Sequence, residues 1–260
     1  MEVIIQPTPE AAAALVAALI ARAVRRKPSL VLGLATGRTM ERVYNALVHM
    51  HREEWLDFSL CRTFNLDEYV GLPPQDPHSY RHYMDERFLR HINIDPRNTY
   101  LPNGMASDLD AECLSYEALI QEHGGIDFQL LGIGRDGHIG FNEPLSALRS
   151  RTRVKALTEQ TLHDNSEGES GALPRRAITM GVGTILESRR CVLLASGAQK
   201  ADVIAKAVEG PITAMISASA LQLHPKCTVV VDEAAAGRLK GQPYYRWVFA
   251  NEPEWEEFRT

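Results

Sequence analysis

Residues 8–39 read TPEAAAALVAALIARAVRRKPSLVLGLATGRT and contain a helix, a strand and the turn into a second helix. Thr8 is suited to cap the first helix, Pro9 to fill its first position, and basic residues gather just before Pro28, where the helix must stop. The apolar run at 30–34 is short and does not alternate with polar residues, as in strands buried on both faces. This stretch therefore predicts one α-to-β unit of a parallel sheet.

The same alternation extends along most of the chain. Further short apolar runs lie at 3–5, 61–64, 128–133, 191–195 and 228–231, and segments of helical period at 39–53, 80–92, 108–123, 200–208 and 213–221. Right-handed crossovers place helices on both faces of such a sheet. We predict one doubly wound, Rossmann-like, three-layer α/β domain over residues 1–260, with ligands bound where the strands end.

The composition is that of an ordinary globular chain of 260 residues, with 28 Lys and Arg against 33 Asp and Glu and a net charge of −5. A protein that grips nucleic acid would need a clustered basic face, which this balance argues against. Nucleic acid is therefore not expected as a partner.

The four cysteines are Cys61, Cys113, Cys191 and Cys227, with no pair at metal or redox spacing. They are expected to be buried thiols in a reducing compartment. The longest apolar run, residues 11–21, is too short to cross a bilayer, and Glu2 stands where a signal peptide needs a basic residue. We predict a cytoplasmic protein without a membrane partner.

The turn at residues 35–39 follows a strand and precedes a helix, so its amide groups and hydroxyls could bind a phosphate. It is not a Walker A loop, because no Gly-Lys-Ser/Thr sequence follows. A plain connection with Thr39 as the helix cap is an equally good interpretation.

The run GIGRDG at residues 132–137 fits the G-x-G-x-x-G pattern of dinucleotide-binding proteins. That pattern needs a helix at its third glycine, whereas HIGFNEP follows here and is broken by Gly and Pro. We therefore predict that this segment does not bind a nicotinamide cofactor.

The same segment suits acid–base chemistry, since Asp136, His138 and Glu143 lie within eight residues at a strand end. Two carboxylates fix one tautomer of an imidazole and stabilise its protonated form. A surface hydrogen-bonded histidine and a half-formed metal site are the alternatives, since this ligand set also suits zinc or iron. Another carboxylate, Asp67 or Glu68, follows the strand at 61–64, and extended backbone allows only one of the two to face a cleft.

Residues 158–176 interrupt the alternation, because they are polar, rich in Gly and Ser, and lack helical or strand period. A solvated surface loop is the simpler interpretation, and a mobile lid over the site is the functional one.

Six stretches resemble the glucosamine-6-phosphate deaminases, in family order and across nearly the whole chain. They are LGLATGRT (32–39), FNLDEYVGL (64–72), GIGRDGHIGFNEP (132–144), SRTRVKALT (150–158), TMGVGTIL (179–186) and LQLHPK (221–226). The resemblance implies conversion of glucosamine 6-phosphate and water to fructose 6-phosphate and ammonium. It implies no metal and no organic cofactor.

The resemblance also implies roles for single residues. Asp67 would move a proton from C2 to C1, and His138 would open the sugar ring with Asp136 and Glu143 orienting it. Residues that would bind the phosphate are Thr36, Gly37, Arg38, Thr39 and Lys200.

Two positions depart from the family pattern. Arg38 replaces a second glycine, and Glu167 replaces an arginine that follows Asn-Ser in the lid. A glutamate repels phosphate, so we expect Arg38 to supply the charge that the lid has lost.

The positions of an allosteric site between subunits, which binds N-acetylglucosamine 6-phosphate in some members, correspond to Ser146, Arg153 and Lys155. A homo-oligomer is therefore possible. A deaminase of another amino-sugar phosphate and a non-catalytic sugar-phosphate sensor stay as alternatives, although a sensor would not need both Asp67 and His138.

Overall fold

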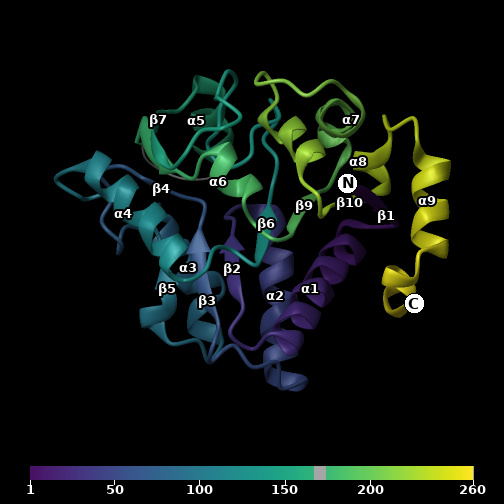
Figure 1. Ribbon diagram of the computed structural model, residues 1–260, viewed down its shortest axis with the longest axis horizontal. Helices are drawn as coiled ribbons and strands as arrows, with labels where there is room; N and C mark the ends of the chain where they lie inside the picture. Colours follow the sequence, from purple (N-terminus) through teal and green to yellow (C-terminus); the bar gives the residue numbers. More distant parts are fainter. Residues whose placement is uncertain (167–173, 260) are drawn as a thin grey trace.

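The computed structural model describes residues 1–166 and 174–259, which form a central seven-stranded sheet with helices on both faces (Figure 1). Every strand pair of this sheet is parallel. In spatial order the strands are β1 (Glu2–Gln6), β10 (Cys227–Asp232), β9 (Cys191–Ala195), β6 (Phe128–Leu131), β2 (Val31–Leu34), β3 (Arg62–Asn65) and β5 (Thr99–Tyr100). The doubly wound α/β prediction is confirmed.

The direction of each crossover connection decides on which face of the sheet its helix lies. Helices α1 (Pro9–Arg26) and α2 (Arg38–Glu53) pack on each other, on the face used by crossovers toward β3. Crossovers running the other way place α4 (Leu109–Glu122) and α7 (Ala201–Glu209) on the opposite face, since both kinds are right-handed. The direction in which successive strands are added to the sheet reverses between β2 and β6. The crevice for a ligand therefore lies at the carboxyl ends of these two strands.

Helix α1 forms as its sequence predicts. The Thr8 hydroxyl accepts a hydrogen bond from the amide of Ala11, and Pro9 fills the first position. Its buried face is rich in alanine, which lets the helix lie close to the sheet. Burying the larger side chains of this face stabilises the fold by roughly 1.5–3 kcal/mol each.

A second, smaller sheet was not predicted. It is antiparallel and consists of β4 (Asp67–Tyr69), β8 (Arg176–Thr179) and β7 (Arg153–Ala156), with β8 in the middle (Figure 1). Its strands are three or four residues long, and β7 is half exposed, so none carries the buried apolar run that identifies the main sheet. This sheet holds Asp67.

Several predicted elements differ in detail. The segment at 80–92 is α3 (Tyr80–Arg87) followed by a 3-10 turn η1 (Leu89–His91). The helix predicted at 213–221 is wrong, because a 3-10 helix, η4 (Ser217–Leu223), occupies part of it. The remaining elements are η2 (Pro96–Asn98), α6 (Val182–Leu186), η3 (Ala198–Lys200), α8 (Glu233–Ala236), α9 (Gln242–Asn251) and η5 (Pro253–Phe258).

The predicted loop at 158–176 is wrong in its first half, which is helix α5 (Glu159–Ser166). The Thr158 hydroxyl accepts a hydrogen bond from the amide of Thr161, as a helix cap does, and Glu159 favours the first turn. Residues 167–173, including Glu167, lie outside the described residues.

The four cysteines are buried free thiols, as predicted. Burial raises the pKa of Cys227 to about 12, which keeps this thiol protonated and unreactive. Among the described residues, no helix is both long enough and apolar enough to span a membrane.

Candidate active site

A cavity of about 900 Å³ opens at the carboxyl edge of the main sheet, within the size range of small-molecule sites. Its walls come from the segments that follow β2, β6 and β9, from Asp67 on β4, and from α3. The chain thus brings together four strand ends that are far apart in sequence.

The turn after β2 presents an unfilled helix N-terminus to this cavity. Gly37 is the cap residue of α2, and as a glycine it has no side chain to bond the first amides of the helix. Thr39 is therefore not the cap, since the helix already begins at Arg38. Thr36 and Thr39 line the cavity together with Gly37, so amides and hydroxyls face one end of it. This is the arrangement of a phosphate site.

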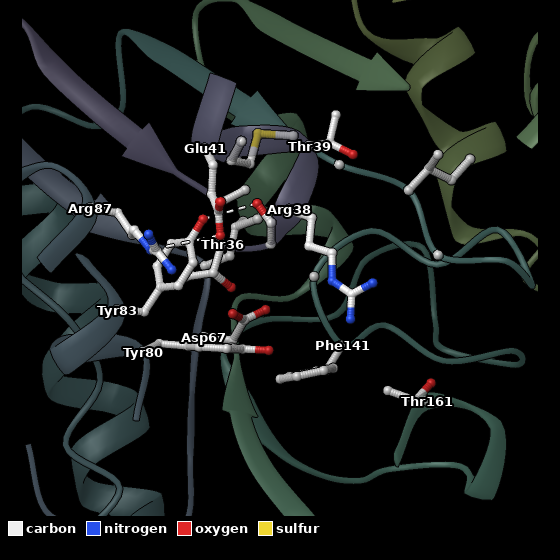
Figure 2. A pocket seen from close by; sticks show the side chains of 18 of the residues that line it. Thr36, Arg38, Thr39, Glu41, Asp67, Tyr80, Tyr83, Arg87, Phe141 and Thr161 are labelled. Atoms are coloured by element: carbon white, nitrogen blue, oxygen red, sulfur yellow. Dashed lines mark hydrogen bonds and ion pairs between the residues drawn. The ribbon is translucent and has the colours of Figure 1, made fainter. Parts of the chain in front are cut away.

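Cationic side chains surround the same end. Arg38 extends its guanidinium into the cavity (Figure 2), and Arg135 and Lys200 also line it. The ammonium group of Lys200 donates a hydrogen bond of 2.6 Å to the carbonyl of Ile133, which ties η3 to the end of β6. Arg135 is a lining residue that the sequence analysis missed, although it lies inside the GIGRDG run.

His138 lies against two carboxylates, as predicted. Its Nδ1 is 2.6 Å from Oδ1 of Asp136 and 3.5 Å from Oε2 of Glu143. The Nδ1–H bond does not point along these contacts, so they act as ion pairs more than as aligned hydrogen bonds. Burial lowers the pKa of His138, but the two carboxylates outweigh it and raise that pKa to about 9. His138 lines the cavity as a protonated imidazole at neutral pH.

The pKa of Asp136, which lies beside His138, is shifted in the opposite direction. Burial raises the pKa of Asp136, but its contacts with His138 prevail and hold that pKa at about 2. Asp136 and Glu143 do not line the cavity themselves, so they lie behind the imidazole and act through it. Nδ1 faces the carboxylates, which leaves Nε2 for a substrate.

Asp136, His138 and Glu143 also have the residue types of a metal site. One ligand atom from each of Asp136, His138 and Glu143 falls within a 4.8 Å group, a set that zinc or iron accepts. Two atoms that bind one ion at roughly 2.0–2.2 Å each lie about 3 Å apart or more. The 2.6 Å between Nδ1 and Oδ1 is shorter, and it fits an ion pair between imidazolium and carboxylate better than a shared metal.

The G-x-G-x-x-G run has a different use from the one its pattern indicates. The segment after Gly137 is a series of turns, so the helix required by a dinucleotide site is missing there. A Cβ on Gly134 would lie 2.4–2.6 Å from the His138 ring. This glycine therefore makes room for the imidazole and not for a pyrophosphate.

Asp67 is a buried carboxyl group that faces the cavity. Burial and, to a smaller extent, the charge of Glu68 raise its pKa, His138 partly offsets both, and the resulting pKa is about 8. Of the two adjacent carboxylates only Asp67 lines the cavity, as the extended backbone predicted. Glu68 points away and accepts hydrogen bonds from the amides of Tyr80 and Arg81, at the start of α3.

An aromatic wall explains the burial of Asp67. Tyr69, Tyr80 and Phe141 pack together with ring centres 4.9–6.0 Å apart, and Figure 2 shows Tyr80 and Phe141 next to the carboxyl group. The three rings come from β4, α3 and the turn after β6. Sequence analysis missed this wall, because nothing local in the chain indicates that these rings meet.

On the outer side, α3 is fastened to the turn at residues 35–39 and to the start of α2. The Tyr83 hydroxyl donates a hydrogen bond of 2.9 Å to the carbonyl of Gly37, and Arg87 lies 3.7 Å from Glu41 on α2 (Figure 2). These contacts fix the separation between the phosphate end and the aromatic wall.

The three candidate effector residues lie outside the cavity. Ser146 is buried, Arg153 donates a hydrogen bond of 2.9 Å to the side-chain oxygen of Asn142, and Lys155 lies half-buried on β7. The candidate lid does touch the site, since Thr161 of α5 lines the cavity and the Thr158 amide donates to Glu143 at 3.2 Å.

Comparison with known proteins agrees with this geometry. Residues 6–230 match the family of glucosamine-6-phosphate isomerases and 6-phosphogluconolactonases, and the chain belongs to this family. Within it, the chain is 51% identical over 250 residues to a glucosamine-6-phosphate deaminase of Hahella chejuensis, covering 95% of each chain. It is 50% identical to one of Streptomyces coelicolor, covering 98% of this chain and 99% of the relative.

Solved structures show the same fold. A monomeric glucosamine-6-phosphate deaminase superposes with a TM-score of 0.90 at 46% identity, over 92% of this chain and 100% of that one. A 6-phosphogluconolactonase from Trypanosoma cruzi superposes with a TM-score of 0.74 at 19% identity, over 92% and 97%, which is a likeness of fold alone.

Proposed function

We propose that the chain is an enzyme that isomerises and deaminates glucosamine 6-phosphate, giving fructose 6-phosphate and ammonium. The observation that carries the proposal is the meeting, in one cavity, of a carboxyl group and an imidazole whose pKa values are raised to about 8 and about 9. Curated relatives that are about half identical over nearly the whole chain bear the deaminase name. A sensor would not need two groups tuned in this way.

His138 and Asp67 would act at different atoms of the sugar. The imidazolium of His138 gives its proton to the ring oxygen as the C1–O5 bond breaks, and the C1 hydroxyl gives up its own proton to water, which leaves the open-chain aldehyde. The carboxylate of Asp67 then takes the C2 proton and returns it to C1, while the C1 oxygen gains a proton through water and the amine loses one, leaving a C1 hydroxyl and an imine at C2. Water adds to this imine, and ammonia leaves as the ketone forms. The amine and carbonyl of the substrate accept the electrons, so the scheme uses no metal or organic cofactor.

The phosphate of the substrate would occupy the other end of the cavity. Amides and hydroxyls of the turn at 35–39 would bind its oxygens, and Arg38 and Lys200 would balance its charge. Because Arg38 is the first residue of α2, this charge is mounted on a fixed element.

An ammonium assay tests the reaction itself. Purified protein should release ammonium from glucosamine 6-phosphate, and Asp67→Asn should lower kcat by roughly 10²- to 10⁴-fold, the usual contribution of a general base. The lactone of 6-phosphogluconate serves as the second substrate and should not be hydrolysed. Equal release of ammonium by both proteins would remove Asp67 from the reaction. Galactosamine 6-phosphate, run beside the first substrate, distinguishes the epimers.

A matched pair of variants tests the phosphate end. Arg38→Ala should raise KM for the phosphorylated sugar roughly 10- to 100-fold, because a charged hydrogen bond to the phosphate is lost. Arg42→Ala is the control, since Arg42 lies on the same helix, pairs with Glu10 and does not line the cavity. An unchanged KM in Arg38→Ala would contradict the assignment.

Regulation and assembly are separate proposals. Ser146, Arg153 and Lys155 would form an effector site for N-acetylglucosamine 6-phosphate in a homo-oligomer. A hyperbolic rate curve that this sugar leaves unchanged, together with a monomer in solution, would remove both.

A further inference from the structure

The stretch TMGVGTIL, residues 179–186, has no part in the function proposed so far, although its first two residues lie between the two catalytic groups. Thr179 ends β8, and its main chain pairs with Asp67 in the antiparallel ladder. Opposite residues of such a pair project their side chains from the same face of the sheet. The Thr179 side chain is therefore on the Asp67 side.

The same side chain holds the turn that carries His138. The Thr179 hydroxyl accepts a hydrogen bond of 3.0 Å from the amide of Phe141 and donates one of 3.3 Å to the carbonyl of Met180. Thr179 is fully buried, so water cannot replace it as the partner of that amide.

The main chain of Met180 also links the residue before Asp67 to the turn that carries His138. Its amide donates to the carbonyl of Leu66 at 2.7 Å, and its carbonyl accepts from the side-chain amide of Asn142 at 2.8 Å. Thr179 and Met180, which we call the bridge segment, thus contact the residue before Asp67 on one side and the His138 turn on the other.

The spacing at this point is tight. A Cβ on Gly140 would lie 2.9 Å from the Thr179 hydroxyl oxygen and 3.4 Å from Oδ2 of Asp67. The His138 turn therefore rests directly on the two side chains, and a small shift of Thr179 changes its distance from Asp67.

We infer that Thr179 is a positioning residue, which sets the separation between Asp67 and His138 by pairing with the first and holding the turn of the second. The inference rests on the proposed function, because it assigns Asp67 and His138 to one reaction. It places no reacting atom on Thr179.

Thr179→Val tests this with little change of shape, since it removes the hydroxyl and leaves the Phe141 amide without a partner. We expect kcat for ammonium release to fall roughly 30- to 100-fold, as a misplacement of about 1 Å does. KM should change less than about threefold, because the phosphate turn belongs to β2 and not to the bridge segment. Thr179→Ser restores the hydroxyl and should return kcat to within about threefold of the wild type.

Thr63→Val is the matched control. Thr63 on β3 is also fully buried, but its hydroxyl has no partner among the described residues, and it does not line the cavity. Its kcat and KM should be those of the wild type. Circular dichroism at the assay temperature establishes that each variant is folded.

The pH profile separates positioning from mere support of the fold. When the turn moves away, water reaches the Asp67 carboxyl group, so the acidic limb of the Thr179→Val profile should move to lower pH. A kcat within twofold of the wild type, an unmoved acidic limb, or equal losses in the valine and serine variants would overturn the inference. If the valine variant does not fold, Thr179→Ala replaces it with the same expectations. Absence of ammonium release by the wild type would instead defeat the proposed function.

Discussion

His138 and Asp67 face the same cavity, and both pKa values are raised, but by different causes: neighbouring charges for His138 and burial for Asp67. The pKa of His138 rises to about 9 because two carboxylates, two and five residues away in sequence, outweigh the effect of its burial. The pKa of Asp67 rises to about 8 because of burial, and the rings that bury it come from distant segments. One group is tuned by local charge and the other by packing.

This difference has consequences for catalysis. A protonated acid and an ionised base coexist only between the two pKa values, so the proposed reaction should run best at mildly alkaline pH. Changes of charge near His138 should move the alkaline limb of the pH profile of kcat/KM. Changes of packing around Asp67 should move its acidic limb. The following predictions test the contrast, from the largest effect to the smallest.

Filling the space between the two groups should have the largest effect. Gly140 has φ +55°, and a Cβ there would press on Thr179 and Asp67, so Gly140→Ala should lower kcat by roughly 100-fold or more. Gly124→Ala is the control, because Gly124 has φ +81° but nothing within 4 Å of the added carbon. Steady-state ammonium assays compare the two, and equal losses would mean that backbone strain alone is responsible.

Removing one local charge should move one limb of the pH profile. In Asp136→Asn the pKa of His138 falls, so the alkaline limb of kcat/KM, near pH 9 in the wild type, should move down by about one to two pH units. Glu143→Gln should move it less, since that contact is 3.5 Å instead of 2.6 Å. The acidic limb should stay within a few tenths of a unit in both variants, and a larger movement there would contradict local tuning.

The smallest expected effect concerns stability, which should rise when the buried Asp67 carboxyl group is removed. The pKa of Asp67 is about 8 in the folded chain and near 4 when unfolded, so its ionisation destabilises the fold increasingly as pH rises from 4 to 8. Asp67→Asn should therefore raise Tm by about 2–5 °C at pH 8.5, and by less at pH 5. Thermal melts across this range measure the difference. A gain that does not depend on pH would show that the carboxyl group is not the cause.

The parts of the fold that could be predicted were those that depend on patterns within a few consecutive residues. Helix α1 follows from Thr8 and Pro9, and the parallel sheet from short apolar runs buried on both faces. The small sheet could not be predicted in this way, because its three short strands are defined by pairing with segments up to about a hundred residues away. Helix α5 was missed although Thr158 and Glu159 form a recognisable start.

The candidate site divides in the same manner. Asp136, His138 and Glu143 were predicted as a cluster because one turn brings them together. Tyr80, Phe141 and Arg135 were missed as cavity residues, since their place depends on where α3 and the turn after β6 meet. The alternation of an extended chain predicted that one of Asp67 and Glu68 would face the cavity, and the structure shows that it is Asp67.

The order of residues alone determined which groups are present: a histidine between two carboxylates, a turn with Thr and Gly after β2, and another carboxylate after β3. It determined these because they depend on neighbours within a few positions of the chain. Only the tertiary structure decided how strong a base Asp67 is and how far it stands from His138. That carboxyl group is buried beside Tyr80 of α3 and Phe141 of the turn after β6 (Figure 2), and no local pattern records which elements meet.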